Sequence, residues 1–273
     1  MKVGIIGGTG GMGSLFARVF RDAGHDVIIS GRRTEITNED IAKTADIVVI
    51  SVPIRDTISV IETLLPFLSQ NQLITDLTSL KSEQVKAMLK SSARVIGLHP
   101  MFGPSIGSIN GQTIVATPAR CNKEDFDLLR SIFEDEGARV TVTNPEDHDR
   151  MMAVIQGLTH FKALLLAGTM RRLSISPADT EPYISPIYRI ETGIAGRILS
   201  QNPDLYCDIL CLNPYIPSVL NACLITAREI DEIISKGNSD AFSTEFLASR
   251  EWFGVFCEQA QKETDDLILS MVH

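Results

Sequence analysis

The stretch KVGIIGGTGGMG, residues 2–13, decides the fold of this chain. Its first five residues predict a short buried strand, and apolar residues recur with helical spacing between residues 14 and 23. Between strand and helix, Gly8, Gly10 and Gly13 form the pattern G-x-G-x-x-G. The first glycine of such a loop permits a tight turn, the second lets the backbone approach a pyrophosphate, and the third lets the helix pack on the strand. The stretch therefore predicts a unit that binds a dinucleotide.

The same loop indicates which residues contact the cofactor. The start of a helix presents unpaired N–H groups and the positive end of its dipole, and both favour phosphate. A purely structural glycine turn is disfavoured, because the pattern begins at residue 8, follows a strand and opens a helix. The expected cofactor-binding residues of the loop are Gly8, Thr9, Gly10, Gly11, Met12 and Gly13.

Strands and helices alternate along the first half of the chain. Further strands are expected at residues 27–29, 45–52, 73–76, 95–98, 113–116 and 139–143, and helices at 58–68 and 83–89. Apolar character on both faces of these strands is typical of a parallel sheet covered by helices. We expect an α/β Rossmann fold with a doubly wound, mostly parallel sheet and right-handed crossovers.

The pattern changes near residue 145. Asn144-Pro145 predicts a helix start, with asparagine as the N-cap and proline in the first turn, and Ser185-Pro186 and Asn202-Pro203 repeat the device. Residues 216–236 and 240–271 read as two long helices separated by Gly237. No strand is expected after about residue 150. The sequence thus predicts a Rossmann domain at 1–146 and an all-helical domain at 147–273.

The length, net charge and hydrophobicity of the chain limit the classes of function that it can have. A chain of 273 residues is long enough for two domains. The net charge of -9 argues against a nucleic-acid partner, which requires a basic face. No run of about 18 apolar residues is seen, so no membrane span is expected. With no leader pattern recognised, a cytoplasmic location is expected.

The five cysteines are scattered and lack metal-binding spacing. We expect them to be small buried residues in a reducing compartment, with no metal site. His25 and His148 are expected at the surface.

The end of the second strand bears on cofactor choice. NAD enzymes usually place Asp or Glu there to bind the ribose 2′-hydroxyl, whereas this chain has Ser30-Gly31-Arg32-Arg33. Two guanidinium groups suit a 2′-phosphate, so Gly31, Arg32 and Arg33 favour NADP over NAD. The alternative is that both arginines are solvated loop charges and the cofactor is NAD.

Two polar segments follow neighbouring strands. Ser79 lies in the segment 76–81 and His99 in the segment 97–104, both just beyond strand ends, where ligands of open α/β sheets bind. The pKa of an ordinary histidine lies near neutrality, which suits acid–base work. We therefore take His99 as the candidate catalytic residue and Ser79 as a hydroxyl able to orient it.

A family resemblance rests on a series of segments spread over most of the chain. The segments are Gly7-Gly8-x-Gly10-x-Met12-Gly13, Val52-Pro53, Asp76-x-x-Ser79-x-Lys81, residues 97–104 (GLHPMFGP), Gln156-x-x-Thr159-His160-Phe161, residues 185–189, Gly196-Arg197 and residues 251–254. In these residues and their order the chain resembles the prephenate dehydrogenases of tyrosine biosynthesis.

The resemblance implies an activity. A prephenate dehydrogenase takes hydride from C4 of a cyclohexadiene to the nicotinamide, and loss of carbon dioxide then gives 4-hydroxyphenylpyruvate. By resemblance, His99 hydrogen-bonds the 4-hydroxyl and assists its deprotonation, and Ser79 supports His99. A base must already be in place, because the hydroxyl becomes acidic only as the hydride leaves. The helical domain is implied to form a homodimer.

The resemblance also implies a set of binding residues. Arg197 matches the family arginine that binds a substrate carboxylate, and Arg189 lies two turns earlier on the same expected helix. An interdomain salt bridge is an equal reading for Arg189. His160 would be a satisfied core histidine on its own, but its match suggests the substrate cleft. Tyr206 is assigned to substrate binding, and Val52 and Pro53 to the cofactor.

Some positions depart from the family pattern. Pro104-Ser105 stands where some members have Thr-Glu, Tyr206 stands where some carry Trp, and the acidic ribose residue is missing. An arogenate or dual-specificity cyclohexadienyl dehydrogenase therefore stays open. So do an NADP-dependent dehydrogenase of another small acid and a dinucleotide-sensing protein without chemistry.

Overall fold

The computed structural model describes residues 1–271, which form two compact units. The first contains Met1–Gln156 and Asp204–Tyr215, and the second contains Gly157–Pro203 and the chain from Ile216 onward. This division differs from the expected boundary at 146/147, because the first unit also takes in residues 147–156 and the returning segment 204–215.

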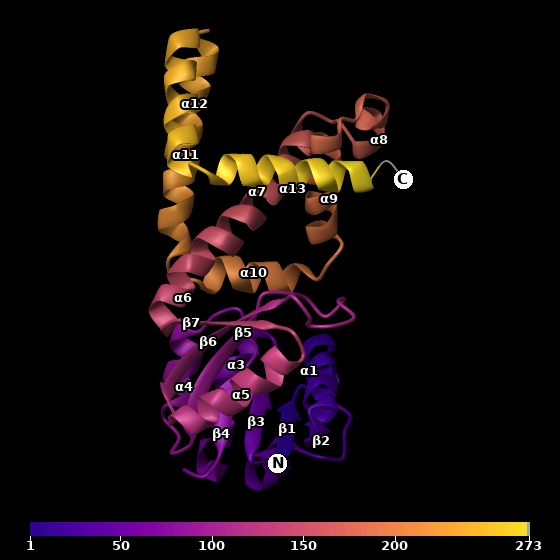
Figure 1. The fold of residues 1–273 in the computed structure, drawn as a ribbon, viewed down its shortest axis with the longest axis vertical. Helices are drawn as coiled ribbons and strands as arrows, with labels where there is room; N and C mark the ends of the chain where they lie inside the picture. Colours follow the sequence, from indigo (N-terminus) through magenta and orange to yellow (C-terminus); the bar gives the residue numbers. More distant parts are fainter. Residues whose placement is uncertain (272–273) are drawn as a thin grey trace. The chain divides into compact units, whose positions relative to one another are not determined.

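A seven-stranded sheet forms the centre of the first unit (Figure 1). Its strands are β1 (Lys2–Ile6), β2 (Asp26–Ser30), β3 (Ile47–Ile50), β4 (Leu73–Asp76), β5 (Arg94–Pro100), β6 (Thr113–Arg120) and β7 (Arg139–Val142). Their order is β2-β1-β3-β4-β5-β6-β7, and every neighbouring pair is parallel except β5 and β6. The prediction of a doubly wound, mostly parallel sheet is confirmed.

Helices flank both faces of the sheet. They are α1 (Gly11–Asp22), α2 (Asn38–Thr44), α3 (Ile54–Leu64), α4 (Ser82–Met88), α5 (Lys123–Asp135) and α6 (Pro145–Met152). The helix α10 (Pro203–Leu212) belongs to the same unit from Asp204 onward, and its Ile209 packs with Ile54 and Leu80. Sequence analysis did not anticipate α2 and α5. Each begins with a capping box, Thr37 with Asp40 and Asn122 with Asp125, which satisfies two N–H groups at the helix start.

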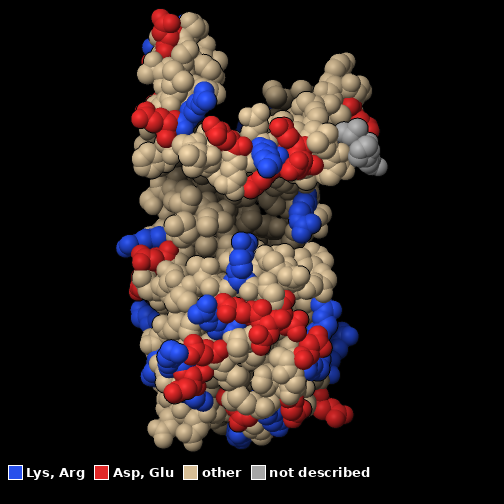
Figure 2. All heavy atoms as spheres, in the orientation of Figure 1, with Lys and Arg blue, Asp and Glu red and all other residues tan. Residues whose placement is uncertain are grey.

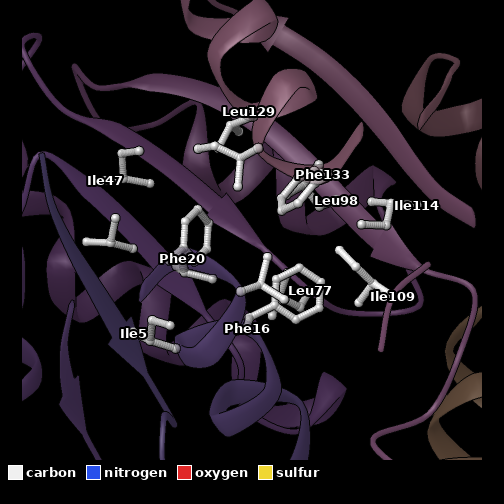
Figure 3. Close-up of a cluster of buried hydrophobic side chains, with 14 of the residues drawn as sticks. Ile5, Phe16, Phe20, Ile47, Leu77, Leu98, Ile109, Ile114, Leu129 and Phe133 are labelled. Carbon is white, nitrogen blue, oxygen red and sulfur yellow. The ribbon is translucent and has the colours of Figure 1, made fainter. Parts of the chain in front are cut away.

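The sheet is buried on both sides because its strands carry apolar residues on alternate faces. Ile47 and Val49 pack with α1 and α5, whereas Val48 and Ile50 pack with α2, α3 and α4. Aromatic rings close the first of these two layers, with Phe16 and Phe20 of α1 packing edge-on against Phe133 of α5 (Figure 3). This rigid centre fixes the carboxyl ends of the strands along one edge.

The position of β1 creates a crevice at that edge. β1 lies between β2 and β3, so the connections leaving β1 and β3 run to opposite sides of the sheet. Ligands of open α/β sheets bind at such switch points. The glycine loop follows β1 directly, and the segment that contains His99 ends β5 on the same sheet.

The second unit consists of helices and the loops that join them, within its described residues. Its helices are α7 (Thr159–Arg172), α8 (Pro177–Thr180), α9 (Pro186–Leu199), α11 (Ile216–Ser235), α12 (Ser239–Phe253) and α13 (Phe256–Ser270). The expected single helix over 240–271 is wrong, because the chain breaks at Gly254, whose φ of 55° is strained for other residues. No strand follows β7 within residues 1–271, as predicted.

One long helix bears on the expectation about membrane-spanning segments. Within the described chain, the helix Pro145–Arg172 is long enough to span a membrane, with a mean hydropathy of 1.3 over its most apolar 18 residues. Sequence analysis sought an uninterrupted apolar run, whereas this helix mixes apolar and small polar residues. A single helix of this kind is weak evidence for a membrane, because helices of globular proteins also meet the criterion.

The distribution of charge that Figure 2 shows agrees with the expectation that no basic face is present, whereas the exposure of the cysteines does not agree with expectation. Acidic and basic side chains lie interspersed over the sheet-containing unit (Figure 2), so no face of it in that view has a single sign of charge. The prediction of buried cysteines is wrong. Cys207 and Cys211 are exposed on α10, and Cys223 of α11 and Cys257 of α13 are partly exposed, because these helices carry uncovered faces in a single chain. Cys121, in the loop between β6 and α5, is also partly exposed.

Candidate active site

A cavity of about 760 Å³ lies beside the glycine loop. It is lined by Ile6, Gly7, Thr9, Gly10, Gly31, Arg32, Arg33, Thr34, Asn38, Ser51, Val52 and Pro53. The structure thus brings together three segments that sequence analysis assigned to the cofactor, namely the loop, residues 31–33 and Val52-Pro53. Gly8, Gly11, Met12 and Gly13 belong to the same loop and to the start of α1 but do not line the cavity. Thr34, Asn38 and Ser51 were missed.

The glycine loop is packed too closely for larger residues. Gly7 has a φ of 79°, and the backbone N–H groups of Gly7 and Gly8 both donate to the carbonyl of Ser30 at 3.0 Å. A Cβ on Gly8 would lie 2.6 Å from the Cβ of Ile29, and one on Gly13 would lie 2.4 Å from the Gly7 carbonyl oxygen. Helix and strand therefore meet as the dinucleotide loop requires.

The loop after β2 is held in a defined conformation. The backbone N–H of Gly31 donates to Thr34 Oγ1 at 2.8 Å, and Ser30 Oγ donates to Asn38 Oδ1 at 2.7 Å. Arg32 and Arg33 are exposed at the cavity, and no carboxylate lines it among the described residues. The shape and charge of this cavity fit a nicotinamide dinucleotide.

The segment after β5 connects this cavity to His99. A Cβ on Gly11 would lie 2.8 Å from the Cβ of Pro104, so the two loops are in close contact. Phe102 of the same segment stacks on Phe16 of α1, with 6.4 Å between ring centroids. The residues flanking His99 are therefore packed on the cofactor-binding loop and its helix.

His99 is buried and held by a second histidine. Its side chain is 2% exposed, and its Nδ1 lies 2.9 Å from Nε2 of His148 on α6. His148 Nδ1 lies 2.8 Å from Asp149 Oδ1. The three side chains form a continuous hydrogen-bonded series that ends in a carboxylate.

Asp149 is fixed by the start of α4. Its Oδ1 accepts from the backbone N–H of Lys81 and its Oδ2 from that of Ser82, both at 2.9 Å. Burial opposes ionisation of this carboxyl, but hydrogen bonds from His148, Ser82 and Lys81 lower its pKa below the ordinary value. The positive end of the α4 dipole also favours the carboxylate.

An ionised Asp149 determines the tautomer of both histidines. Asp149 can only accept, so His148 donates through Nδ1 and accepts from His99 Nδ1 through Nε2. The remaining nitrogen of His99, Nε2, then carries a lone pair. Burial lowers the pKa of His99 well below its ordinary value, and the protonated form of His148 and the ammonium of Lys81 each lower it further. His99 is therefore a neutral base at neutral pH.

A buried lysine braces the strand that carries His99. Lys81 Nζ donates to the carbonyl of Leu98 at 2.7 Å and pairs with the carboxylate of Asp76, which Thr78 also contacts. Burial lowers the pKa of Lys81, and the charge of Asp76 opposes this effect. The pair fixes the backbone immediately before His99.

Two sequence interpretations near His99 are altered. No hydrogen bond joins Ser79 to His99 within residues 1–271, and His148 occupies the supporting position instead. His148 is 1% exposed, so its expected surface location is wrong. Neither residue spacing nor composition indicated that α6 turns this histidine towards β5.

The remaining candidates are spread over both units. Tyr206 lies on α10 of the first unit, two residues before Asp208, whose carboxylate accepts from Arg55 Nε at 2.8 Å. His160 lies on α7 and Arg189 and Arg197 on α9, all in the second unit. Burial lowers the pKa of His160, and both arginines are exposed on their helix.

The chain is similar to known proteins over nearly its whole length. Residues 22–142 match the family profile "Prephenate dehydrogenase, nucleotide-binding domain", and residues 144–248 match "Prephenate dehydrogenase, dimerization domain". A probable arogenate/prephenate dehydrogenase of Methanocaldococcus jannaschii is 35% identical, covering 99% of this chain and 65% of that protein. The T-protein of Haemophilus influenzae is also 35% identical, covering 98% and 71%. The chain thus spans about two thirds of the length of these relatives.

A solved structure shares the fold. Prephenate dehydrogenase from Aquifex aeolicus, in complex with hydroxyphenyl propionate and NAD+, superposes with a TM-score of 0.73 at 22% identity. The match covers 93% of this chain and 98% of that one.

Proposed function

This chain belongs to the prephenate dehydrogenase family, and we propose that it oxidises and decarboxylates prephenate to 4-hydroxyphenylpyruvate in tyrosine biosynthesis. The observation that carries the proposal is the series His99–His148–Asp149, which presents a buried neutral base at the end of β5 beside the loops of the dinucleotide cavity. Arogenate is the second candidate substrate, because the 35% identical relative is named for both substrates.

The dinucleotide would be held by the residues of the cavity. Its pyrophosphate would contact the backbone of Thr9 and Gly10 near the start of α1, and Val52 and Pro53 would line its path along the sheet edge. Arg32 and Arg33, with no lining carboxylate to repel a phosphate, support NADP rather than NAD. When bound, the nicotinamide supplies the acceptor for the C4 hydride.

His99 acts as the general base. The 4-hydroxyl of the substrate donates its proton to Nε2 of His99, the nitrogen that the hydrogen-bonded series leaves with a lone pair. The Nδ1 proton of His99 can then shift to His148, whose positive charge is balanced by Asp149. A base poised in this way contributes about 10²- to 10⁴-fold to the rate.

Cationic and polar side chains would bind the two carboxylates of the substrate. We assign this role to Arg197 and Arg189 of α9, with His160 and Tyr206 completing the binding set. Charge-assisted hydrogen bonds from arginine to carboxylate are both strong and geometrically specific. Ser79, which lies between β4 and α4, is proposed to contact the substrate rather than to orient His99.

We also propose that the chain acts as a homodimer through its helical unit. That unit exposes many large apolar side chains, among them Phe246, Trp252 and Val255. The matching family profile for residues 144–248 is described as a dimerization domain.

The test of the proposal is a grid of assays with prephenate and arogenate against NAD and NADP, on the wild type and on His99→Asn. We expect the wild type to turn over prephenate with a preference for NADP. A variant in which both Arg32 and Arg33 are replaced by alanine should lose this preference. His99→Asn should lower kcat by about 10²-fold or more without weakening cofactor binding. His25→Asn, which changes a half-exposed histidine, serves as the control. Near-normal activity of His99→Asn would refute the catalytic assignment.

A further inference from the structure

Gln156 occupies an irregular part of the long helix 145–172. It lies in the π-helical stretch Ala153–Leu158, between α6 and α7, and is the last residue of the sheet-containing unit before the chain enters the other. π-helical turns are rare, and they occur frequently at functional sites. The wider turn changes where the side chain of Gln156 points relative to a regular helix.

The side chain of Gln156 faces the reactive nitrogen of His99. Its Nε2 lies 3.4 Å from Nε2 of His99. Because Asp149 orders the tautomers, His99 Nε2 carries a lone pair, and only the N–H of the Gln156 amide can satisfy it. At 3.4 Å this bond is long and weak, and a ligand can displace it at little cost.

The other end of the amide has no partner. Gln156 Oε1 is buried and accepts no hydrogen bond within the described chain. An unsatisfied buried carbonyl is costly, and such groups in native structures call for a specific reason. The amide therefore has one long hydrogen bond through Nε2 and none through Oε1, directly beside the base.

We propose that Gln156 is a catalytic residue that holds the reacting hydroxyl of the substrate against His99. The substrate oxygen enters between the two side chains, so that its O–H donates to His99 Nε2 and its lone pair accepts from Gln156 Nε2. The inference rests on the proposed function and adds a second side chain, after His99, that contacts the reacting oxygen.

Gln156 would remain hydrogen-bonded to the substrate oxygen throughout the reaction. The O–H bond breaks towards His99, and its electron pair forms the C4 carbonyl as the hydride leaves C4 for the dinucleotide. When the ring carboxylate departs as carbon dioxide, the electrons of the broken C–C bond aromatise the ring and return charge to the oxygen. His99 then returns the proton. Negative charge grows on this oxygen, and a fixed N–H donor stabilises such charge most.

Several charged and titratable groups face His99 and influence its pKa. His148 of α6 and Lys81 before α4 lie nearest, with Asp149 behind His148 and Asp76 paired to Lys81. Gln156 is the uncharged member of this surrounding. A carboxylate in its place would favour the protonated form of His99 and raise the pKa of His99.

The experiment compares Gln156→Leu and Gln156→Glu with wild type. We expect Gln156→Leu to lower kcat about 100-fold with little change in KM, as for other donors to a developing oxyanion. Gln156→Glu should move the acid limb of kcat/KM to higher pH by about one unit or more. In enzyme without cofactor, ¹⁵N NMR of His99 should show the same upward shift. Gln84→Leu is the matched control, because Gln84 is also buried in the first unit with an unpaired Oε1.

The outcomes separate this inference from the proposed function. If His99→Asn is inactive while Gln156→Leu keeps more than half of the wild-type kcat, the role of Gln156 is refuted and the proposed function stands. If neither prephenate nor arogenate is turned over, the proposed function fails. In that case the NMR titration alone tests the role of Gln156. An unchanged pKa of His99 in Gln156→Glu would refute the contact between Gln156 and His99. An effect of Gln156→Leu on thermal stability alone, matched by Gln84→Leu, would also overturn it.

Discussion

At the scale of single residues, the structure shows that His99 is hydrogen-bonded to partners that set its tautomer. His99 and His148 are 49 positions apart in the chain and 2.9 Å apart in space. Asp149 lies beyond them and receives two backbone N–H groups from the start of α4. The carboxylate therefore decides which nitrogen of each ring carries a proton, and it compensates the positive charge that the series takes up.

Asp149→Asn tests this ordering. An asparagine presents an N–H₂ group to one of the two backbone N–H donors, so one hydrogen bond is lost and the tautomers are no longer specified. We expect kcat to fall about 100-fold, within the usual contribution of a general base. Loss of the negative charge disfavours the protonated pair, so the acid limb of kcat/KM should move to lower pH.

The control for this change is Asp147→Asn, which alters an exposed carboxylate in the first turn of the same helix. Its kcat and pH profile should match wild type. A kcat of Asp149→Asn within threefold of wild type would show that His99 works without the ordered series.

At the scale of elements, the strand–loop–helix at the N-terminus depends on backbone contacts that only glycine allows. The strand β1, the glycine loop and α1 were all predicted from the sequence, because periodicity and glycine spacing are local signals. The helices α2 and α5 were not anticipated, although their capping boxes are visible in the sequence. The break at Gly254 was also missed, since a single glycine within a helical pattern does not always end a helix.

Gly8→Ala tests the close packing of the loop. The added methyl group would lie 2.6 Å from Ile29 and 3.0 Å from the carbonyl oxygen of Ile5, so the backbone must shift. Overpacking of this kind costs roughly 1–3 kcal/mol of stability. We expect a lower melting temperature and a cofactor Kd, measured by fluorescence, raised at least 10-fold.

Gly107→Ala is the matched change, because a Cβ there has no neighbour within 4 Å. It should leave both measurements unaltered. Wild-type cofactor affinity in Gly8→Ala would mean that this glycine is not required by the dinucleotide.

At the scale of the whole molecule, the helical unit leaves much apolar surface uncovered. Trp252 is 90% and Val255 89% exposed, and they lie on either side of the break between α12 and α13. Exposed apolar patches of this kind mark interaction surfaces. The proposed homodimer would cover them, and it would also account for the apolar character of the helix 145–172.

Light scattering on a size-exclusion column tests the assembly. A chain of 29.9 kDa should elute with twice that mass if the homodimer forms. Phe246→Glu places a charge on an exposed apolar side chain of α12, and we expect it to shift the mass towards the monomer because a buried unpaired charge is costly. Gln70→Glu, at an exposed position of the sheet-containing unit, should remain dimeric. A monomeric wild type would contradict the proposal.

The sequence by itself determined the Rossmann sheet, the dinucleotide loop, the helical second half and the candidacy of His99. These follow from local signals, namely alternation, helical spacing, glycine pattern and strand ends. Only the tertiary structure decided what surrounds His99. His148, Asp149 and Gln156 come from the long helix 145–172 and Lys81 from the start of α4, and their roles depend on how α4, α6 and the π-helical stretch pack at the end of β5. Periodicity records which residues face the core of their own element. It carries no information on which distant element supplies the partner of a buried polar group.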